Sequence, residues 1–430
     1  MQLNDLTLTR REWLGGAAAL GACAAWPAWA QAPGGWPNVT RLVQGYVDAR
    51  KVSGMVATLG FGHADPIVIA TGVDSFTAPR RSDLDSIYRI YSMTKPLTGM
   101  AAVSLIDEGK LGLDQPLAEI LPKFAQMQVQ KVYDGPITAD NLEPAMRPIT
   151  IRHLLTHTAG LGYGIVQQGP IAEASRARGV VPGLVTRLQV LPGFRGTPVR
   201  GLDVFVDRLA EMPLVYQPGT KWSYSMAFEV LGRVIEVVSG QSFDRFLQER
   251  FLAPLAMADT HFQVPRAKAE RMTTSYYLLN GNLVPIDLGT DSIYFDDIPL
   301  PFGGAGLAST PRDYDRFLAM LVGRGAFEGR RVMSEAAVAL GTSDILPDTL
   351  LPGGGYDPEW GYGAGGRVGR EGDYAGAYGW AGAAGTIGFI HPGLKLRAGL
   401  FTQYMPQMAY PLIDEFPAAI VADIAALAPA

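Results

Sequence analysis

The chain reads Tyr91-Ser92-Met93-Thr94-Lys95-Pro96 at the start of a helical pattern that ends near Gly109. Ser92 and Lys95 are three residues apart, so at a helix start they lie on one face about one turn apart. A serine hydroxyl needs a base to act as a nucleophile, and a lysine amine is a base only when neutral, which burial favours. N–H groups at a helix start can also hold a developing oxyanion. The stretch predicts a nucleophile and its base, against the alternative of two solvated side chains.

A second stretch, Gln217-Pro218-Gly219-Thr220-Lys221-Trp222-Ser223-Tyr224-Ser225, places a tyrosine after a Pro-Gly turn. An apolar stripe of helical spacing follows it and closes at Gly240. A tyrosine beside a lysine can pass a proton between a nucleophile and a leaving group. Tyr224 is therefore the predicted third catalytic residue; the alternative is an aromatic side chain that only packs.

A third stretch reads Gly379-Trp380-Ala381-Gly382-Ala383-Ala384-Gly385-Thr386 and opens an apolar strand. Glycine and alanine allow a substrate to lie close against a strand edge. A backbone N–H there, assigned to Ala383, can complete an oxyanion hole with the N–H of Ser92. The alternative is a glycine-rich strand with a bulge.

The composition excludes several classes of protein. The 430 residues include 36 Lys and Arg against 41 Asp and Glu, a net charge of −5 without a long basic run, which argues against nucleic-acid binding. One cysteine permits neither an intramolecular disulfide nor a Cys-rich zinc site. His153 and His157 lack a third ligand nearby and are interpreted as structural. No metal and no cofactor are expected.

The N-terminal segment predicts export. Arg10 and Arg11 precede an uncharged, Ala- and Gly-rich run that ends in Ala28-Trp29-Ala30. This pattern is typical of a cleaved twin-arginine signal peptide over residues 1–30, with a retained anchor as the alternative. A second possible processing site, Leu20-Gly21-Ala22-Cys23, would make Cys23 a lipid-bearing residue, but the later site is better formed. The expected location is periplasmic or secreted, without stable membrane insertion after processing.

The order of elements predicts an α+β fold. Short apolar strands are expected at both ends of the mature chain and helices between them. We expect a sheet domain built from residues 31–100 and 305–430, and a mostly helical domain over 101–304. The expected strands are 54–62, 66–72, 86–91, 378–390 and 396–402, and the clearest expected helices are 37–50, 92–109, 227–240, 309–321 and 410–427.

Taken together and in this order, the three stretches resemble the penicillin-binding and class C β-lactamase superfamily of serine hydrolases. Further similar segments are His153–Leu161, Gly303–Thr310 and Asp313–Phe317. The resemblance runs from about residue 37 to the C-terminus. It implies a β-lactamase/transpeptidase-like fold, with an antiparallel sheet flanked by helices and an inserted, mostly helical domain. It also implies an acyl-enzyme on Ser92, with Lys95 and Tyr224 as the acid–base pair.

Two departures from the family pattern favour an ester substrate. Met226 stands where β-lactamases and D-peptidases have Asn, and Trp380-Ala381-Gly382 stands where they have Lys-Thr-Gly or His-Thr-Gly. Tryptophan and alanine offer neither the ion pair nor the hydroxyl bond that hold a substrate carboxylate. The pattern resembles the esterase branch called family VIII carboxylesterases. We therefore expect a small-molecule ester with an uncharged, partly apolar acyl group, bound by Trp380, Gly382, Trp222 and Tyr163.

Other functions stay open at this point. A β-lactamase or D-amino-acid peptidase, or a transesterase, would use the same fold. A non-catalytic cell-wall-sensing module on this scaffold is a further alternative, although it would not need Ser92, Lys95 and Tyr224 together. An α/β-hydrolase is disfavoured because no serine has the glycines of Gly-x-Ser-x-Gly. The sequence does not fix the oligomeric state.

Overall fold

The computed structural model describes residues 33–181, 183–188, 191, 194–350 and 356–426. The predicted export signal, residues 1–30 with Cys23, lies outside them. None of the helices in the described ranges has the length and apolar character needed to cross a membrane.

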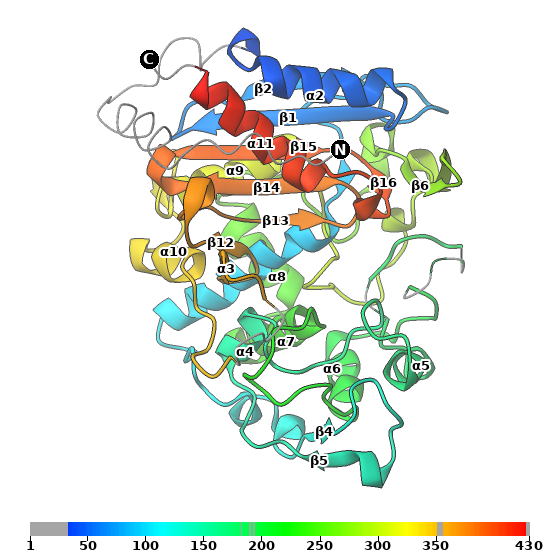
Figure 1. The fold of residues 1–430 in the computed structure, drawn as a ribbon, viewed down its shortest axis with the longest axis vertical. Helices are drawn as coiled ribbons and strands as arrows, with labels where there is room; N and C mark the ends of the chain where they lie inside the picture. Colours follow the sequence, from blue (N-terminus) through cyan, green and yellow to red (C-terminus); the bar gives the residue numbers. More distant parts are fainter. Residues whose placement is uncertain (1–32, 182, 189–190, 192–193, 351–355, 427–430) are drawn as a thin grey trace.

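A seven-stranded antiparallel sheet joins the two ends of the described chain (Figure 1). Strands from the N-terminal part pair with strands from the C-terminal part, because β1 hydrogen-bonds to β15 on one side and to β2 on the other. Along the sheet the order is β11 (Trp360–Tyr362), β12 (Arg367–Gly369), β13 (Tyr378–Gly382), β14 (Thr386–His391), β15 (Leu396–Phe401), β1 (Gly54–Phe61) and β2 (Ile67–Gly72).

Helices cover both faces of this sheet, and every residue of β1 is buried as a result. On one face α2 (Pro37–Asp48) and α11 (Leu412–Ala425) pack against the sheet through Val39, Val43 and Phe416. The Asp423 carboxylate accepts from the N–H of Asn38 at 2.9 Å, so the last described helix caps the first. On the opposite face α9 (Pro311–Val322) contacts β1, β14 and β15.

Helices α4, α5, α6 and α7 lie on the side of α3 that faces away from the sheet, whereas α10 lies beside α3 close to the sheet (Figure 1). Nearly all of α3 is buried, and it packs against α7 and α10. Gly240 ends α7 with φ 71°, a left-handed conformation that glycine adopts at low cost. The helices are α3 (Thr94–Asp107), α4 (Ile151–Leu155), α5 (Pro170–Ala177), α6 (Leu202–Ala210), α7 (Ala227–Ser239), α8 (Phe243–Leu247) and α10 (Glu335–Thr342).

Short strands complete the fold. They are β3 (Tyr88–Arg89) with β8 (Ala308–Ser309), β4 (Gln128–Gln130) with β5 (Leu142–Pro144), β6 (Ser275–Leu279) with β7 (Asn282–Asp287) and β16 (Tyr404–Met405), and β9 (Ala326–Phe327) with β10 (Arg330–Arg331). The mostly helical segment 101–304 thus also holds small sheets. The α+β fold is confirmed. The boundaries of the two predicted domains stay a prediction, and α3 runs across the expected boundary at residue 100.

Three elements differ from their predicted extents. The strand expected over 86–91 is only Tyr88–Arg89, because the chain turns at once into a 3₁₀ turn, Tyr91–Met93. The helix expected to begin near Ser92 therefore begins at Thr94 and keeps Pro96 in its first turn, where a missing N–H costs nothing. The strand expected over 378–390 is a hairpin, since Gly385, with φ 82°, turns the chain between β13 and β14.

Candidate active site

Ser92 lies in the short 3₁₀ turn between β3 and α3. The residue before it, Tyr91, has φ 41°, a conformation that is strained for a residue with a Cβ. Ser92 is 9% exposed, and it lines a pocket of about 510 Å³. A sharp turn thus presents an otherwise buried hydroxyl to a cavity.

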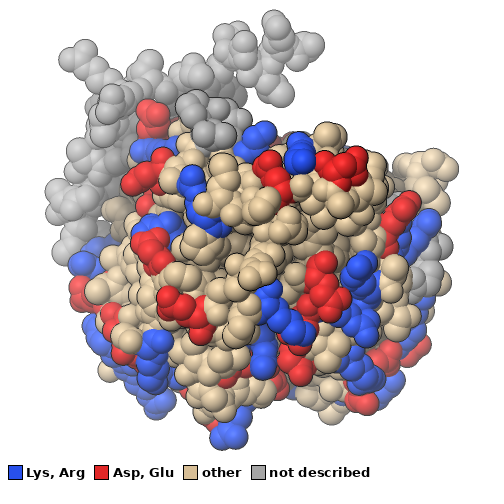
Figure 2. All heavy atoms as spheres, turned by 90° about the horizontal axis from the view of Figure 1, so that it is seen from below, with Lys and Arg blue, Asp and Glu red and all other residues tan. Residues whose placement is uncertain are grey.

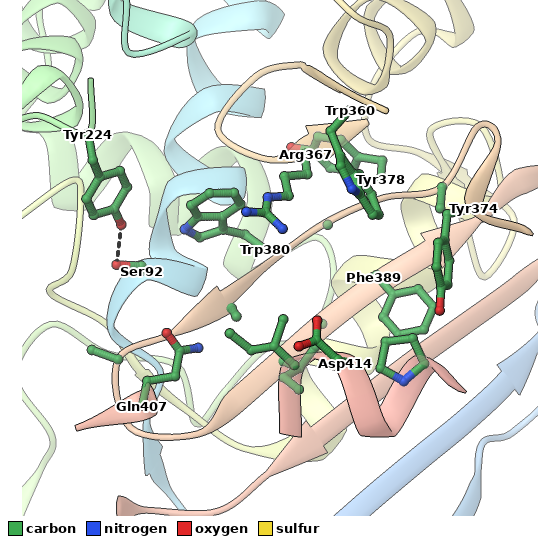
Figure 3. A pocket seen from close by; sticks show the side chains of 18 of the residues that line it. Ser92, Tyr224, Trp360, Arg367, Tyr374, Tyr378, Trp380, Phe389, Gln407 and Asp414 are labelled. Atoms are coloured by element: carbon green, nitrogen blue, oxygen red, sulfur yellow. Dashed lines mark hydrogen bonds between the residues drawn. The ribbon is translucent and has the colours of Figure 1, made fainter. Parts of the chain in front are cut away.

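The other two predicted catalytic side chains meet at the Ser92 hydroxyl. The Tyr224 hydroxyl donates to Ser92 Oγ at 2.6 Å (Figure 3), and Lys95 Nζ donates to the same oxygen at 3.2 Å. Lys95 Nζ also lies 4.5 Å from the centre of the Tyr224 ring. One hydroxyl therefore has an amine and a phenol within hydrogen-bonding distance.

Lys95 is held from behind by a glycine-rich loop that the sequence interpretation gave no role. Its amine is fully buried and donates to the Gly304 carbonyl at 2.7 Å. On the other side of that residue, the Gly304 N–H donates to Glu229 Oε1 at 3.0 Å. A Cβ on Gly304 would lie 2.6 Å from that carboxylate, so a larger residue there would displace the Glu229 side chain.

Glu229 is a buried carboxyl group that sequence reasoning missed. Burial raises its pKa, and the positive charge of Lys95 opposes that rise. Glu229 does not fall on the apolar stripe that predicted α7, so the pattern contained no sign that its side chain is buried. The tertiary contact with Gly304 is what brings it beside Lys95.

The end of β13 lies next to the Ser92 turn. Ala383 and Ser92 both line the pocket, as the proposed oxyanion hole requires. Gly382 does not line it: its Cα faces the Ile90 carbonyl so closely that a side chain would collide. Gly382 thus allows close packing of β13 against the Ser92 segment, and its expected role in substrate contact stays a prediction.

Aromatic side chains make most of the pocket wall (Figure 3). Trp222 and Trp380 line it, as expected, whereas Tyr163 does not. Tyr163 is buried behind the site, with its ring centre 5.4 Å from that of Tyr224. The aromatic residues of the wall are Trp222, Tyr224, Trp360, Tyr374, Tyr378, Trp380 and Phe389. Such a wall suits an apolar or aromatic ligand.

Both histidines that were interpreted as structural have packing or capping positions. His153 Nδ1 accepts from the Thr150 N–H at 3.2 Å and so caps α4. His157 is buried among aromatic rings, and burial lowers its pKa well below its ordinary value, with the charge of Lys95 as a second cause. Its Nδ1 lies 3.0 Å from Ser225 Oγ. Over the described ranges, no group of three or more His, Cys, Asp or Glu side chains is arranged to hold a metal ion.

Charges are mixed on the surface seen from the helical end of the molecule. Figure 2 shows acidic and basic side chains interspersed over that face.

Comparison with known proteins places these features in a family. A sequence model described as beta-lactamase matches residues 39–422. Esterase EstB of Burkholderia gladioli is 31% identical over 352 residues, which cover 77% of this chain and 81% of EstB. Protein Rv1367c of Mycobacterium tuberculosis (strain ATCC 25618 / H37Rv) is 38% identical over 267 residues, and the match spans 61% of each chain.

A solved structure is similar along most of its length. EstCE1, described as a hydrolase with promiscuous acyltransferase activity, superposes with a TM-score of 0.71 at 25% identity. The superposition covers 89% of this chain and 97% of EstCE1.

Proposed function

Because the chain belongs to the β-lactamase family, we propose that it is a serine hydrolase that cleaves carboxylic esters through an acyl-enzyme on Ser92. The observation that carries the proposal is the convergence of Tyr224 and Lys95 on Ser92 Oγ at 2.6 and 3.2 Å. The similarity to EstB and EstCE1, which are named as an esterase and a hydrolase, supports the hydrolase class.

The proposed reaction is acyl transfer in two steps. Neutral Lys95 accepts the Ser92 proton as Oγ attacks the ester carbonyl, and the N–H groups of Ser92 and Ala383 hold the oxyanion. Tyr224 gives its proton to the departing alkoxide, and the Lys95 ammonium restores that proton to the phenol. Water then attacks the acyl-enzyme, with the same pair as base, and the acid leaves as Ser92 regains its proton.

The pocket favours an uncharged, partly apolar acyl group. Trp222 and Trp380 stand in its wall, and Trp380-Ala381-Gly382 supplies neither a lysine nor a hydroxyl for a substrate carboxylate next to Ser92. This chemistry favours esters over β-lactams and D-peptides.

An ester panel on the purified protein tests the proposal. We expect turnover of short p-nitrophenyl esters to exceed that of a chromogenic cephalosporin, and Ser92→Ala to abolish both turnover and labelling by a fluorophosphonate. Ser104→Ala, in the helix α3 that follows Ser92 and with its hydroxyl bonded to the Ala101 carbonyl, is the matched control. Labelling retained by Ser92→Ala contradicts the nucleophile, and preference for the cephalosporin contradicts the ester.

Acyl transfer to an alcohol in place of water is a second candidate. EstCE1 is described with promiscuous acyltransferase activity, and a mostly apolar wall favours an organic alcohol over water as the acyl acceptor. Adding a primary alcohol to the assay and measuring the new ester by chromatography separates the two outcomes.

We further propose that the protein reaches the periplasm or the exterior through the twin-arginine route. The proposal depends on Arg10 and Arg11 and on the small-residue site Ala28-Trp29-Ala30. Replacement of both arginines by lysine should retain the precursor in the cytoplasm, as fractionation and mass measurement of the N-terminus would show. Export that is unchanged by this replacement contradicts the route.

A further inference from the structure

Arg367 contributes the only Lys or Arg side chain among the described residues that line the pocket. It is the first residue of β12 and pairs with Gly379 of β13. Its guanidinium lies 5.6 Å from the centre of the Trp360 ring and 5.7 Å from that of Trp380. Two aromatic faces thus hold an exposed cation at the pocket wall.

The Arg367 charge has no carboxylate within 4 Å among the described residues, whereas its neighbour Arg370 is paired with Asp344 at 2.6 Å. Asp414, in the first turn of α11, also lines the pocket, and Figure 3 shows it apart from Arg367 across the cavity. Burial raises the pKa of the nearby Tyr356 phenol above its ordinary value, so Tyr356, which shares a side-chain hydrogen bond with Arg367, is neutral and brings no negative charge. An uncompensated cation therefore faces space that a ligand can fill.

Arg367 is separated from the reacting atoms by the Trp380 ring, which lies 5.7 Å from its guanidinium and 6.0 Å from the Tyr224 ring, centre to centre. Its partner Gly379 is four residues from Ala383, which is about 13 Å along an extended chain. Trp380 lies between Ser92 and Arg367 in the view of Figure 3. Arg367 therefore contacts a part of the substrate that is remote from the scissile carbonyl.

We propose that Arg367 binds a carboxylate on the alcohol half of the ester substrate. The inference rests on the proposed ester hydrolysis: because the acyl group proposed there is uncharged, the anion belongs to the alcohol. A guanidinium presents two parallel N–H donors that match a carboxylate, and its other face stacks on aromatic rings as Trp360 and Trp380 allow here. The substrate class is an apolar acyl ester of a hydroxy acid.

Two matched substrates test this assignment: p-acetoxybenzoate, whose leaving group carries a carboxylate, and methyl p-acetoxybenzoate, in which that carboxylate is esterified. For Arg367→Gln we expect KM to rise about tenfold with the charged substrate and to stay unchanged with the methyl ester. Arg367→Lys keeps the charge without the planar fork and should recover part of the loss. Added salt should raise KM for the charged substrate only when Arg367 is present.

Two comparisons complete the design. Arg370→Gln removes a surface arginine three residues away and should leave both esters unaffected. A second substrate pair, mono-p-nitrophenyl glutarate and p-nitrophenyl valerate, carries the charge on the acyl half instead. If Arg367→Gln changes KM equally for charged and neutral esters, Arg367 only supports the tryptophans. If the change in KM is confined to the glutarate pair, the anion lies on the acyl half. Either result overturns the proposal. Absence of turnover of every neutral ester by the unaltered protein is a different failure, that of the proposed function.

Discussion

Among the described residues, the almost completely buried cations Arg89, Arg397 and Lys95 have different surroundings. The side chains of Arg89 and Arg397 are 0% and 2% exposed, and each is paired with a buried aspartate. Lys95 is 0% exposed, yet it donates to a hydroxyl and a carbonyl, and the described residues place no carboxylate within 4 Å of it.

The two arginines join segments of the fold through ion pairs, whereas Lys95 lies at the candidate active site. Arg397 donates to both oxygens of Asp315, at 2.8 and 3.0 Å, and so ties β15 to α9. Arg89 likewise joins β3 to Asp287 at the end of β7. A buried ion pair fixes two segments and keeps both partners charged. The amine of Lys95 instead faces the hydroxyl of the proposed nucleophile, Ser92, and forms no direct ion pair with a described residue.

Replacement of Lys95 by methionine gives the largest expected effect of the comparison on activity. The side chains have similar length, and methionine suits a buried site, so the free energy of unfolding should not fall. Without the base, kcat/KM for a p-nitrophenyl ester should fall about 10⁴-fold, the upper end of what one acid–base group contributes. Ester hydrolysis kinetics and thermal unfolding, measured on the same preparation, check the expected loss of kcat/KM and the expected unchanged stability. If the variant is destabilised but keeps its activity per folded molecule, Lys95 serves only to stabilise the fold, as Arg89 and Arg397 do.

Asp315→Ala should have the opposite outcome. It leaves the Arg397 guanidinium buried without its carboxylate, which should lower the free energy of unfolding by about 3–5 kcal/mol. The kcat of the molecules that remain folded should not change, because β15 and α9 do not line the pocket. Denaturant titration combined with active-site counting measures the two quantities. The double replacement Asp315→Leu with Arg397→Met should cost less than Asp315→Ala alone, since it leaves no unpaired charge.

The sequence predicts the sheet and the helices well because each depends on local pattern. The apolar, β-branched residues of β1 and β2 predict neighbouring strands, and the structure pairs them in register from Met55 with Thr71 to Leu59 with Ile67. The stripe of α7 ends at Gly240, as expected. Predicted boundaries are less accurate where a turn depends on tertiary contacts, as at Tyr91.

The candidate site is only partly predictable for the same reason. Ser92, Lys95 and Tyr224 follow from short segments, and the structure brings them together. Glu229, Gly304 and Arg367 become visible only when segments distant in sequence meet. Tyr163 was expected in the pocket wall because it is aromatic, but most aromatic residues pack, and it lies behind Tyr224.

A buried carboxyl with only a long ion pair, from Asp313 to Arg316 at 4.0 Å, supplies a prediction of intermediate size. Burial raises the pKa of Asp313 from 3.8 to about 6, and it outweighs the opposing effect of the Asp259 N–H at 2.7 Å and the Thr260 hydroxyl, which both donate to the carboxylate. The folded state therefore holds a proton that the unfolded state has lost between pH 3.8 and 6. The stability from this group is complete below that window and is lost as pH rises through it.

Asp313→Asn removes the titration while keeping an oxygen that can accept both bonds. From pH 4 to 7, the free energy of unfolding of the unaltered protein should fall relative to the Asn variant, by up to about 3 kcal/mol. Denaturant titrations of both proteins across this range measure the difference. A constant difference with pH would show that Asp313, like the paired aspartates, is already charged in the folded protein.

The smallest expected effect concerns Glu229, which lies beside Lys95 without forming a direct ion pair. Glu229 faces Lys95 of α3, and its charge also reaches Tyr163. A negative charge near an amine favours the charged form of that amine. Glu229→Gln removes the charge but keeps an oxygen that can accept from the Gly304 N–H. The acid limb of the pH profile of kcat/KM should therefore move to lower pH, with little change at its plateau.

Two variants separate this electrostatic effect from simple positioning. Glu229→Ala leaves the Gly304 N–H buried without its acceptor, so the carbonyl that holds Lys95 loses its support and kcat should fall at every pH. Glu236→Gln changes another glutamate of α7, which is paired with Arg233, and should not move the profile. If the Gln and Ala variants lower kcat equally and neither moves the acid limb, Glu229 only positions the loop. The role of its carboxylate is then structural, like that of Asp287 and Asp315.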